Sequence, residues 1–274
     1  MDLNTEWMSI AVDHQSMNGY VAVPARAKDH PLPVVLVIQE IWGVDEHIQD
    51  MTRRFATAGY RAVAPDLYSL GEKHPALTPE RIQWVKQFLD TMPPAGWANP
   101  EIREQYVAKE PEPRQSGIRE TLGKLFAPRD NQAYARQLAA WVDHFADQNL
   151  PVVSVGYCMG GQLSFLLATK TERLTAAVCN YGMAPEPDDM AHITCPVYGF
   201  YGGTDHRITD LVPGVAEAMA KLGKTFHYKI YPEAGHAFFN DSRVSYHPDA
   251  ARDGWAETLA FFAHALPQTA LAGS

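Results

Sequence analysis

Residues 152–161 constrain the fold of this chain more tightly than any other segment. Four strand-type residues, 152–155, run into Gly156-Tyr157-Cys158-Met159-Gly160-Gly161, and an apolar helical stretch follows. The glycines two positions before and two positions after Cys158 permit a very sharp turn, because any larger side chain would collide there. The segment therefore predicts a buried strand, a strained turn and a helix, with the Cys158 sulfur lifted above the edge of a sheet.

Strand and helix patterns alternate along most of the chain. Residues 34–38 are a continuous aliphatic run, which is typical of a strand buried on both faces. Further strands are predicted at 61–65, 174–180, 196–201 and 226–230, and helices at 46–58, 132–148, 211–222 and 250–265. This alternation predicts an α/β fold, a mostly parallel central sheet with helices on both faces. Near the N-terminus, residues 6–12 and 19–23 predict two short strands that turn at Asn18–Gly19.

Residues 71–130 interrupt the alternation. They contain eight prolines and one segment of clear helical pattern, 79–89, preceded by the N-cap candidate Thr78. An unstructured loop of this length inside a compact fold is unusual, so we expect a helical insertion. The predicted organisation is a single domain over residues 1–274 with the insertion within it.

The overall charge and the cysteine content narrow the classes of partner. A net charge of -9 and a pI near 5.6 argue against nucleic acid or an anionic membrane surface. The sequence contains no signal-peptide pattern and no run near the ~20 apolar residues of a membrane span. Three cysteines are too few for a disulfide framework, which favours a reducing, cytoplasmic setting. The histidines have no metal-binding spacing, and we predict neither a metal nor a cofactor.

A nucleophilic cysteine needs a base, and the base needs an orienting group. Asp205 follows the predicted strand 196–201, and His236 follows the predicted strand 226–230. Because the carboxyl ends of parallel strands share one edge of the sheet, these side chains should meet Cys158 there. The sequence thus predicts Cys158 as nucleophile, His236 as base and Asp205 as orienting acid. The alternatives follow no strand as closely: Asp188, Asp189 and Asp210 for the acid, His192 and His206 for the base.

The loop after residues 34–38 is the expected source of a second oxyanion donor. The backbone N–H of Met159, next to the nucleophile, is the first predicted donor, and the N–H of Ile41 is the second. Glu40 lies in the same loop. Its place predicts a position at the mouth of the site, but from the residues alone we interpret Glu40 as a solvated loop acid.

Five sequence blocks together resemble the dienelactone hydrolase family: residues 38–44, 64–68, 156–161, 201–205 and 234–239. The resemblance implies an α/β-hydrolase fold and a triad made of Cys158, His236 and Asp205. It also implies that Glu40 matches the family glutamate that contacts the nucleophile and holds it as a thiol until substrate arrives. The implied reaction is hydrolysis of a small-molecule ester or lactone.

The expected substrate contacts depart from the family pattern at one position. The resemblance implies an arginine four residues after the catalytic histidine, where this chain has Asn240, and this argues against dienelactone itself as substrate. The predicted substrate-binding residues are Tyr157, Trp42, Asn240 and Arg243. Two alternatives stay open: a broad carboxylesterase or thioesterase, and a binding or redox-sensing protein that uses Cys158 without hydrolysis.

Overall fold

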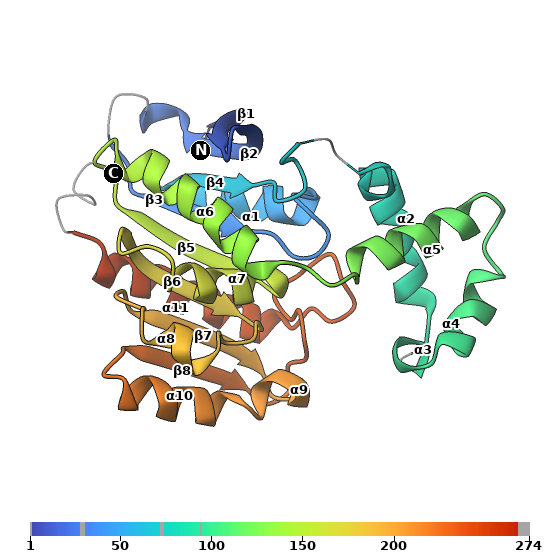
Figure 1. The fold of residues 1–274 in the computed structure, drawn as a ribbon. Coiled ribbons are helices and arrows are strands. Elements are labelled where there is room, and N and C mark those ends of the chain that lie inside the picture. The colour runs from blue at the N-terminus through green and yellow to red at the C-terminus, as the bar shows by residue number, and fades with distance from the viewer. Residues whose placement is uncertain (1, 28–30, 72–73, 94, 268–274) are drawn as a thin grey trace. The chain divides into compact units, whose positions relative to one another are not determined.

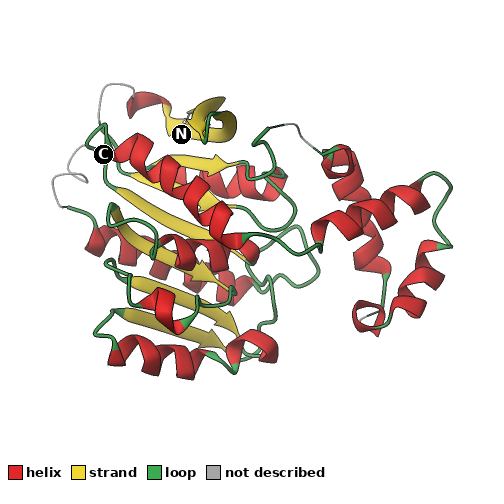
Figure 2. Cartoon of the chain, in the orientation of Figure 1, coloured by secondary structure: helices red, strands yellow, loops and turns green. Residues whose placement is uncertain are grey.

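The computed structural model describes residues 2–27, 31–71, 74–93 and 95–267. Packing divides the chain into two compact units, Met1–Gly71 with Asp130–Ser274, and Glu72–Arg129. In the described part of the first unit, eight strands form one sheet in the order β1-β2-β4-β3-β5-β6-β7-β8 (Figures 1 and 2). Their bounds are β1 (Leu3–Val12), β2 (Gln15–Pro24), β3 (Val34–Ile38), β4 (Arg61–Pro65), β5 (Val152–Tyr157), β6 (Leu174–Asn180), β7 (Val197–Gly202) and β8 (Phe226–Tyr231).

The centre of the sheet is parallel. β3 pairs in parallel with both β4 and β5, and β6, β7 and β8 continue the parallel order, whereas β1 and β2 add an antiparallel edge. All residues of β3 and β5 are buried, as expected for strands covered on both faces. The predicted mostly parallel sheet is confirmed.

Helices cover both faces of this sheet (Figure 1). On one face, the buried side chains of α1 (Glu46–Thr57) and α11 (Pro248–Ala265), including Phe55 and Phe262, join a single core with Val35, Val37 and Val153. On the other, α7 (Met159–Leu167) packs on β5 and β6, and α6 (Asn131–Ala146) packs on α7. The remaining helices of this unit are η1 (Ala25–Ala27), α8 (Pro187–Met190), α9 (His206–Thr209) and α10 (Val212–Lys221).

The N-terminal hairpin differs from the prediction. β1 and β2 turn at Asp13 and His14, both with positive φ as a two-residue hairpin loop requires, and not at Asn18–Gly19. Gly19 instead lies inside β2, where an added Cβ would come within 2.7 Å of the Trp141 ring. The glycine accommodates a tertiary contact from α6, which a local turn pattern cannot reveal. The predicted turn position was therefore wrong.

The insertion is helical, as predicted, but it contains more helices than the one predicted at 79–89. They are η2 (Pro75–Leu77), α2 (Pro79–Thr91), α3 (Ala95–Ala98), α4 (Pro100–Val107) and α5 (Arg114–Leu125). Pro79 and Pro100 each occupy the first turn of a helix, where the missing N–H costs nothing. Pro100, which argued against a helix in the sequence, therefore begins one.

Candidate active site

Cys158 lies on a strained turn between β5 and α7. Its backbone has φ 55° and ψ -115°, a conformation that residues other than glycine rarely adopt. A Cβ at Gly156 would lie 1.8 Å from the Gly160 carbonyl oxygen, and a Cβ at Gly160 would lie 2.2 Å from that of Ile38. The two glycines therefore allow the strand, the helix and β3 to approach closely enough for the turn.

Three side chains form a hydrogen-bonded row at the carboxyl ends of β5, β7 and β8. His236 Nε2 lies 3.2 Å from Cys158 Sγ, and His236 Nδ1 lies 2.6 Å from Asp205 Oδ2. The Asp205 side chain is only 10% exposed, and that of His236 is 33% exposed. The structure thus brings together the three residues predicted as nucleophile, base and acid. The alternative His206 instead lies on the surface beside Asp210.

The loops that carry Asp205 and His236 are joined to each other. The Ala234 carbonyl accepts hydrogen bonds from both the backbone N–H and the hydroxyl of Thr204, each at 3.0 Å. A Cβ at Gly202 would lie 2.4 Å from the Gly235 carbonyl oxygen, so a larger residue would force the loops apart. This contact fixes the acid and the imidazole relative to each other.

The proton affinity of His236 is raised in this arrangement. Burial of the ring opposes the charged form, but the bonds to Asp205 and Cys158 outweigh it and raise the pKa of His236 well above its usual 6.5. His236 Nε2, 3.2 Å from Cys158 Sγ, therefore has a high affinity for a proton.

The other two cysteines lack this environment. Cys179 and Cys195 are buried, and burial raises the pKa of each thiol to about 12. Both remain protonated and shielded at neutral pH. Cys158, which is partly exposed, is the only cysteine of the three suited to react.

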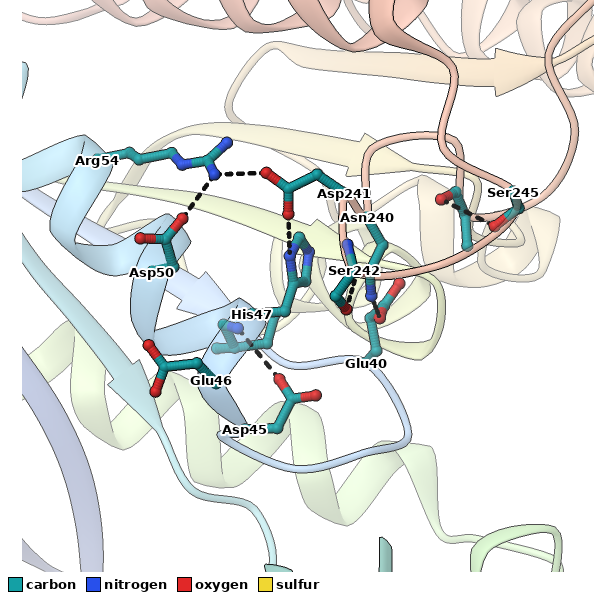
Figure 3. Close-up of polar contacts among 12 residues, drawn as sticks. Glu40, Asp45, Glu46, His47, Asp50, Arg54, Asn240, Asp241, Ser242 and Ser245 are labelled. Atoms are coloured by element: carbon teal, nitrogen blue, oxygen red, sulfur yellow. Dashed lines mark hydrogen bonds and ion pairs between the residues drawn. The ribbon is translucent and has the colours of Figure 1, made fainter. Parts of the chain in front are cut away.

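Glu40 is buried and is not a solvated loop acid. It is 2% exposed, and its Oε2 accepts a 2.7 Å hydrogen bond from Asn240 Nδ2, as Figure 3 shows. Asn240 is fully buried, and its Oδ1 accepts bonds from the Ser242 backbone N–H and hydroxyl. Both ends of the Asn240 amide therefore have partners within the protein, and its predicted contact with substrate finds no support in this placement.

An ion pair fixes the segment that contains Asn240 to α1 (Figure 3). Asp241 Oδ2 lies 2.5 Å from the guanidinium of Arg54, and its Oδ1 lies 3.6 Å from Nδ1 of the buried His47. Partial burial opposes ionisation of Asp241, but Arg54 and, more weakly, His47 hold its pKa below the usual range.

This depressed pKa predicts acid sensitivity. A carboxyl whose folded-state pKa is lowered stabilises the fold above its unfolded value of about 3.9, and the contribution is lost as pH falls through the folded value. We expect Asp241→Asn to unfold at lower urea concentration than wild type at pH 6, with the difference shrinking below about pH 4. Urea denaturation from pH 3 to pH 7 measures this, and a difference independent of pH would contradict it.

The remaining predicted residues have distinct placements. Ile41 lies in the loop after β3, and Met159 begins α7 directly after Cys158; their roles as oxyanion donors stay predictions. Tyr157 is 1% exposed and packs in the core against Phe239, so a direct substrate contact finds no support there. The Arg243 guanidinium lies over the Trp42 ring, 5.4 Å from its centroid.

The sequence analysis missed Tyr181, whose ring packs edge-on against His236 at 5.2 Å between centroids. It directly follows β6, so the rule that found Asp205 and His236 after their strands could also have found it. Its side chain is buried, and burial, followed by the charge of Glu40, raises the pKa of its hydroxyl well above 10. The Tyr181 ring thus covers one side of the His236 imidazole.

Within the described ranges, no group of three or more His, Cys, Asp or Glu side chains is placed to hold a metal ion. No helix in the same ranges has the length and apolar character needed to span a bilayer.

Comparison with known proteins agrees with this fold. The model of the dienelactone hydrolase family matches residues 17–266. A Saccharolobus solfataricus protein named "Putative carboxymethylenebutenolidase" is 34% identical over 251 residues, covering 91% of this chain and 94% of its own. One of the same name from Escherichia coli (strain K12) is 33% identical over 265 residues, covering 93% and 84%. The crystal structure of a "Putative Dienelactone Hydrolase" from Klebsiella pneumoniae superposes with a TM-score of 0.71 at 30% identity, covering 96% of this chain and 99% of that one. A match over nearly the whole chain makes this protein a hydrolase and a member of the dienelactone hydrolase family.

Proposed function

We propose that this protein hydrolyses a small ester or lactone through a thioacyl-enzyme formed on Cys158. The observation that carries the proposal is the row of Cys158, His236 and Asp205, with Sγ 3.2 Å from Nε2 and Cys158 partly exposed on a strained turn. A thiolate beside a base that is itself oriented by a carboxylate is the arrangement that nucleophilic catalysis requires.

The proposed first half-reaction forms a thioester. Cys158 Sγ gives its proton to His236 Nε2 and attacks the substrate carbonyl carbon, whose oxygen takes the negative charge. The Ile41 and Met159 backbone N–H groups are proposed to stabilise that oxyanion. The tetrahedral intermediate collapses, the C–O bond to the leaving alcohol breaks, and the imidazolium returns its proton to the alkoxide.

In the second half-reaction, neutral His236 removes a proton from water, and the resulting hydroxide attacks the thioester. Collapse of this intermediate breaks the C–S bond, releases the carboxylic acid and restores Cys158. Asp205 orients His236 and stabilises the imidazolium that forms in each half. A reducing, cytoplasmic setting would keep the thiol available for this cycle.

The experiment that tests the proposal is direct detection of the covalent intermediate. Wild-type protein mixed with an activated aryl ester is expected to release one equivalent of phenol in a burst and to gain the acyl mass at Cys158. Rapid quench at acidic pH, followed by peptide mass spectrometry, measures both. A dienelactone and a saturated lactone tested in parallel assign the substrate class. Turnover with acyl mass on a different residue would overturn the proposed nucleophile.

A further inference from the structure

The loop after β3 contains a tight turn, residues 40–43, that carries the Ile41 backbone N–H. The Gly43 N–H donates to the Glu40 carbonyl with 3.3 Å between nitrogen and oxygen, and Gly43 has φ 82°, which glycine adopts without strain. This bond is long for an N–H···O contact. It shapes the turn from within but does not fix where the turn lies relative to the sheet.

A shorter bond from the loop after β4 holds the middle of this turn. The Tyr68 hydroxyl donates to the Ile41 carbonyl at 2.8 Å. The Tyr68 ring also packs on the turn, since a Cβ on Gly43 would lie 3.3 Å from its Cδ2 atom. Tyr68 therefore limits both rotation of the peptide that follows Ile41 and movement of the whole turn.

Tyr68 is itself fixed to the sheet. Its backbone N–H donates to Asp66 Oδ1 at 3.0 Å, and the Asp66 N–H donates to a carbonyl of β2 at 2.8 Å. Between them, the Leu67 N–H donates at 3.1 Å to Oε1 of Gln39, a fully buried side chain directly after β3. The loops after β3 and β4 are thus joined at two points, and the residue that holds the turn has little freedom of its own.

The turn begins beside the nucleophile. The Gln39 carbonyl oxygen lies 2.5 Å from where a Cβ on Gly160 would be, and Gly160 is two residues after Cys158. In α/β-hydrolase folds this loop supplies the second backbone donor to the oxyanion. Such a donor is effective only if it is aimed before the charge forms, because reorienting it during the reaction costs free energy. The position of the turn therefore decides how well the Ile41 N–H can serve.

We propose that Tyr68 is a positioning residue: its hydroxyl holds the turn at the Ile41 carbonyl and thereby keeps the Ile41 N–H aimed at the oxygen that becomes negative in the tetrahedral intermediate. The proposal rests on the oxyanion role given to Ile41 in the proposed function. Tyr68 acts through the backbone of the turn. Its loss should therefore slow the steps that form an oxyanion and leave the reactivity of the Cys158 thiol itself unchanged.

The test compares two reactions of Cys158, only one of which forms an oxyanion. Acylation by an activated aryl ester passes through a tetrahedral intermediate, in which the sulfur bonds to the carbonyl carbon before phenolate leaves. Alkylation by iodoacetamide displaces iodide from a saturated carbon and forms no oxyanion. Both rates are measured for wild type and for Tyr68→Phe, which removes the hydroxyl and keeps the ring, by stopped flow with enzyme in excess and by mass spectrometry.

We expect acylation of Tyr68→Phe at saturating ester to be about three- to tenfold slower than that of wild type, with substrate affinity unchanged. Removal of a whole oxyanion donor costs about 10²- to 10³-fold, and the loss here is smaller because the buried Trp42 side chain still anchors the turn. The rate of alkylation should stay as in wild type from pH 6 to pH 9, since neither the thiol nor His236 is altered.

Tyr198→Phe is the matched control. The Tyr198 hydroxyl, on β7, lies 3.4 Å from Glu257 Oε2 on α11, so its removal should leave both rates unchanged. Gly43→Ala is the second variant if Tyr68→Phe does not fold. It strains the positive φ of Gly43 and presses on the Tyr68 ring, so it should slow acylation and spare alkylation in the same way.

Three results would overturn the proposal. Acylation of Tyr68→Phe at the wild-type rate would mean that the turn needs no support from the hydroxyl. An equal slowing of acylation and alkylation would mean that Tyr68 supports the site as a whole, and a loss of substrate affinity alone would assign it to binding. In each case acylation of Cys158 in wild type leaves the proposed function standing. Wild-type protein that reacts with iodoacetamide but is never acylated at Cys158 would instead overturn the proposed function, and this inference with it.

Discussion

Replacing Cys158 by alanine is expected to lower kcat/KM for an activated aryl ester by about 10⁴-fold or more. The activity that remains would come from substrate binding and the oxyanion donors alone. The reason is that the proposed reaction passes through a bond to Sγ, and no neighbouring thiol can replace it. Cys179 and Cys195 are buried, and burial holds each with a pKa of about 12. Initial rates at pH 7 to 8, with enzyme concentration varied, measure the loss.

The matched control for this variant is Cys195→Ala, which removes a buried thiol away from the hydrogen-bonded row. It should keep most of the ester activity, with a modest loss of stability from the small cavity. Comparable unfolding transitions for Cys158→Ala and wild type would exclude misfolding as the cause of lost activity. Hydrolysis by Cys158→Ala within tenfold of wild type would rule out Cys158 as the nucleophile.

Gly156→Ala is expected to destabilise the protein by about 3 kcal/mol or more, because one methyl group has no space to occupy. The added carbon would lie 1.8 Å from the Gly160 carbonyl oxygen and 2.1 Å from its carbon. These are backbone atoms at the start of α7, so relief would require the turn itself to open. Urea denaturation followed by circular dichroism measures the loss, and activity should fall with it as Cys158 moves.

A second glycine in the same unit provides the control. Gly214 lies near the start of α10, where an added Cβ meets nothing within 4 Å. Gly214→Ala should stabilise by about 0.5 to 1 kcal/mol, because alanine loses less conformational freedom in a helix. Equal effects of the two substitutions would contradict the close approach at Gly156.

The residues recognised from sequence are those whose position follows from local pattern and chain order. β3 was recognised because it is a continuous aliphatic run. Asp205 and His236 lie in the loops after two strands, so the rule that parallel strands end at one edge of the sheet was sufficient to place them together. The prediction of a turn at Gly19 failed because this glycine makes room for Trp141, which is more than a hundred residues away in the chain. A turn pattern and a packing requirement favour the same residue type, and only the fold separates them.

Contacts between distant side chains were beyond sequence reasoning. Glu40 and Asn240 are separated by 200 positions, and their bond depends on the direction of two buried side chains. The resemblance drew attention to Glu40 and to Asn240 separately, but not to the bond between them. Tyr181 is an intermediate case: its position after β6 was available, whereas its packing on His236 was not.

The shared carbonyl of Ala234 has a consequence for how such a scaffold can diversify. Because Thr204 bonds to it twice, the loops that carry Asp205 and His236 are held together, while Cys158 belongs to a separate turn between β5 and α7. The reactive atom at position 158 could therefore change from the sulfur of cysteine to the oxygen of serine without a change in how Asp205 and His236 are held. On the proposed mechanism, Cys158→Ser would therefore change the attacking atom and leave the bond between Asp205 and His236 in place.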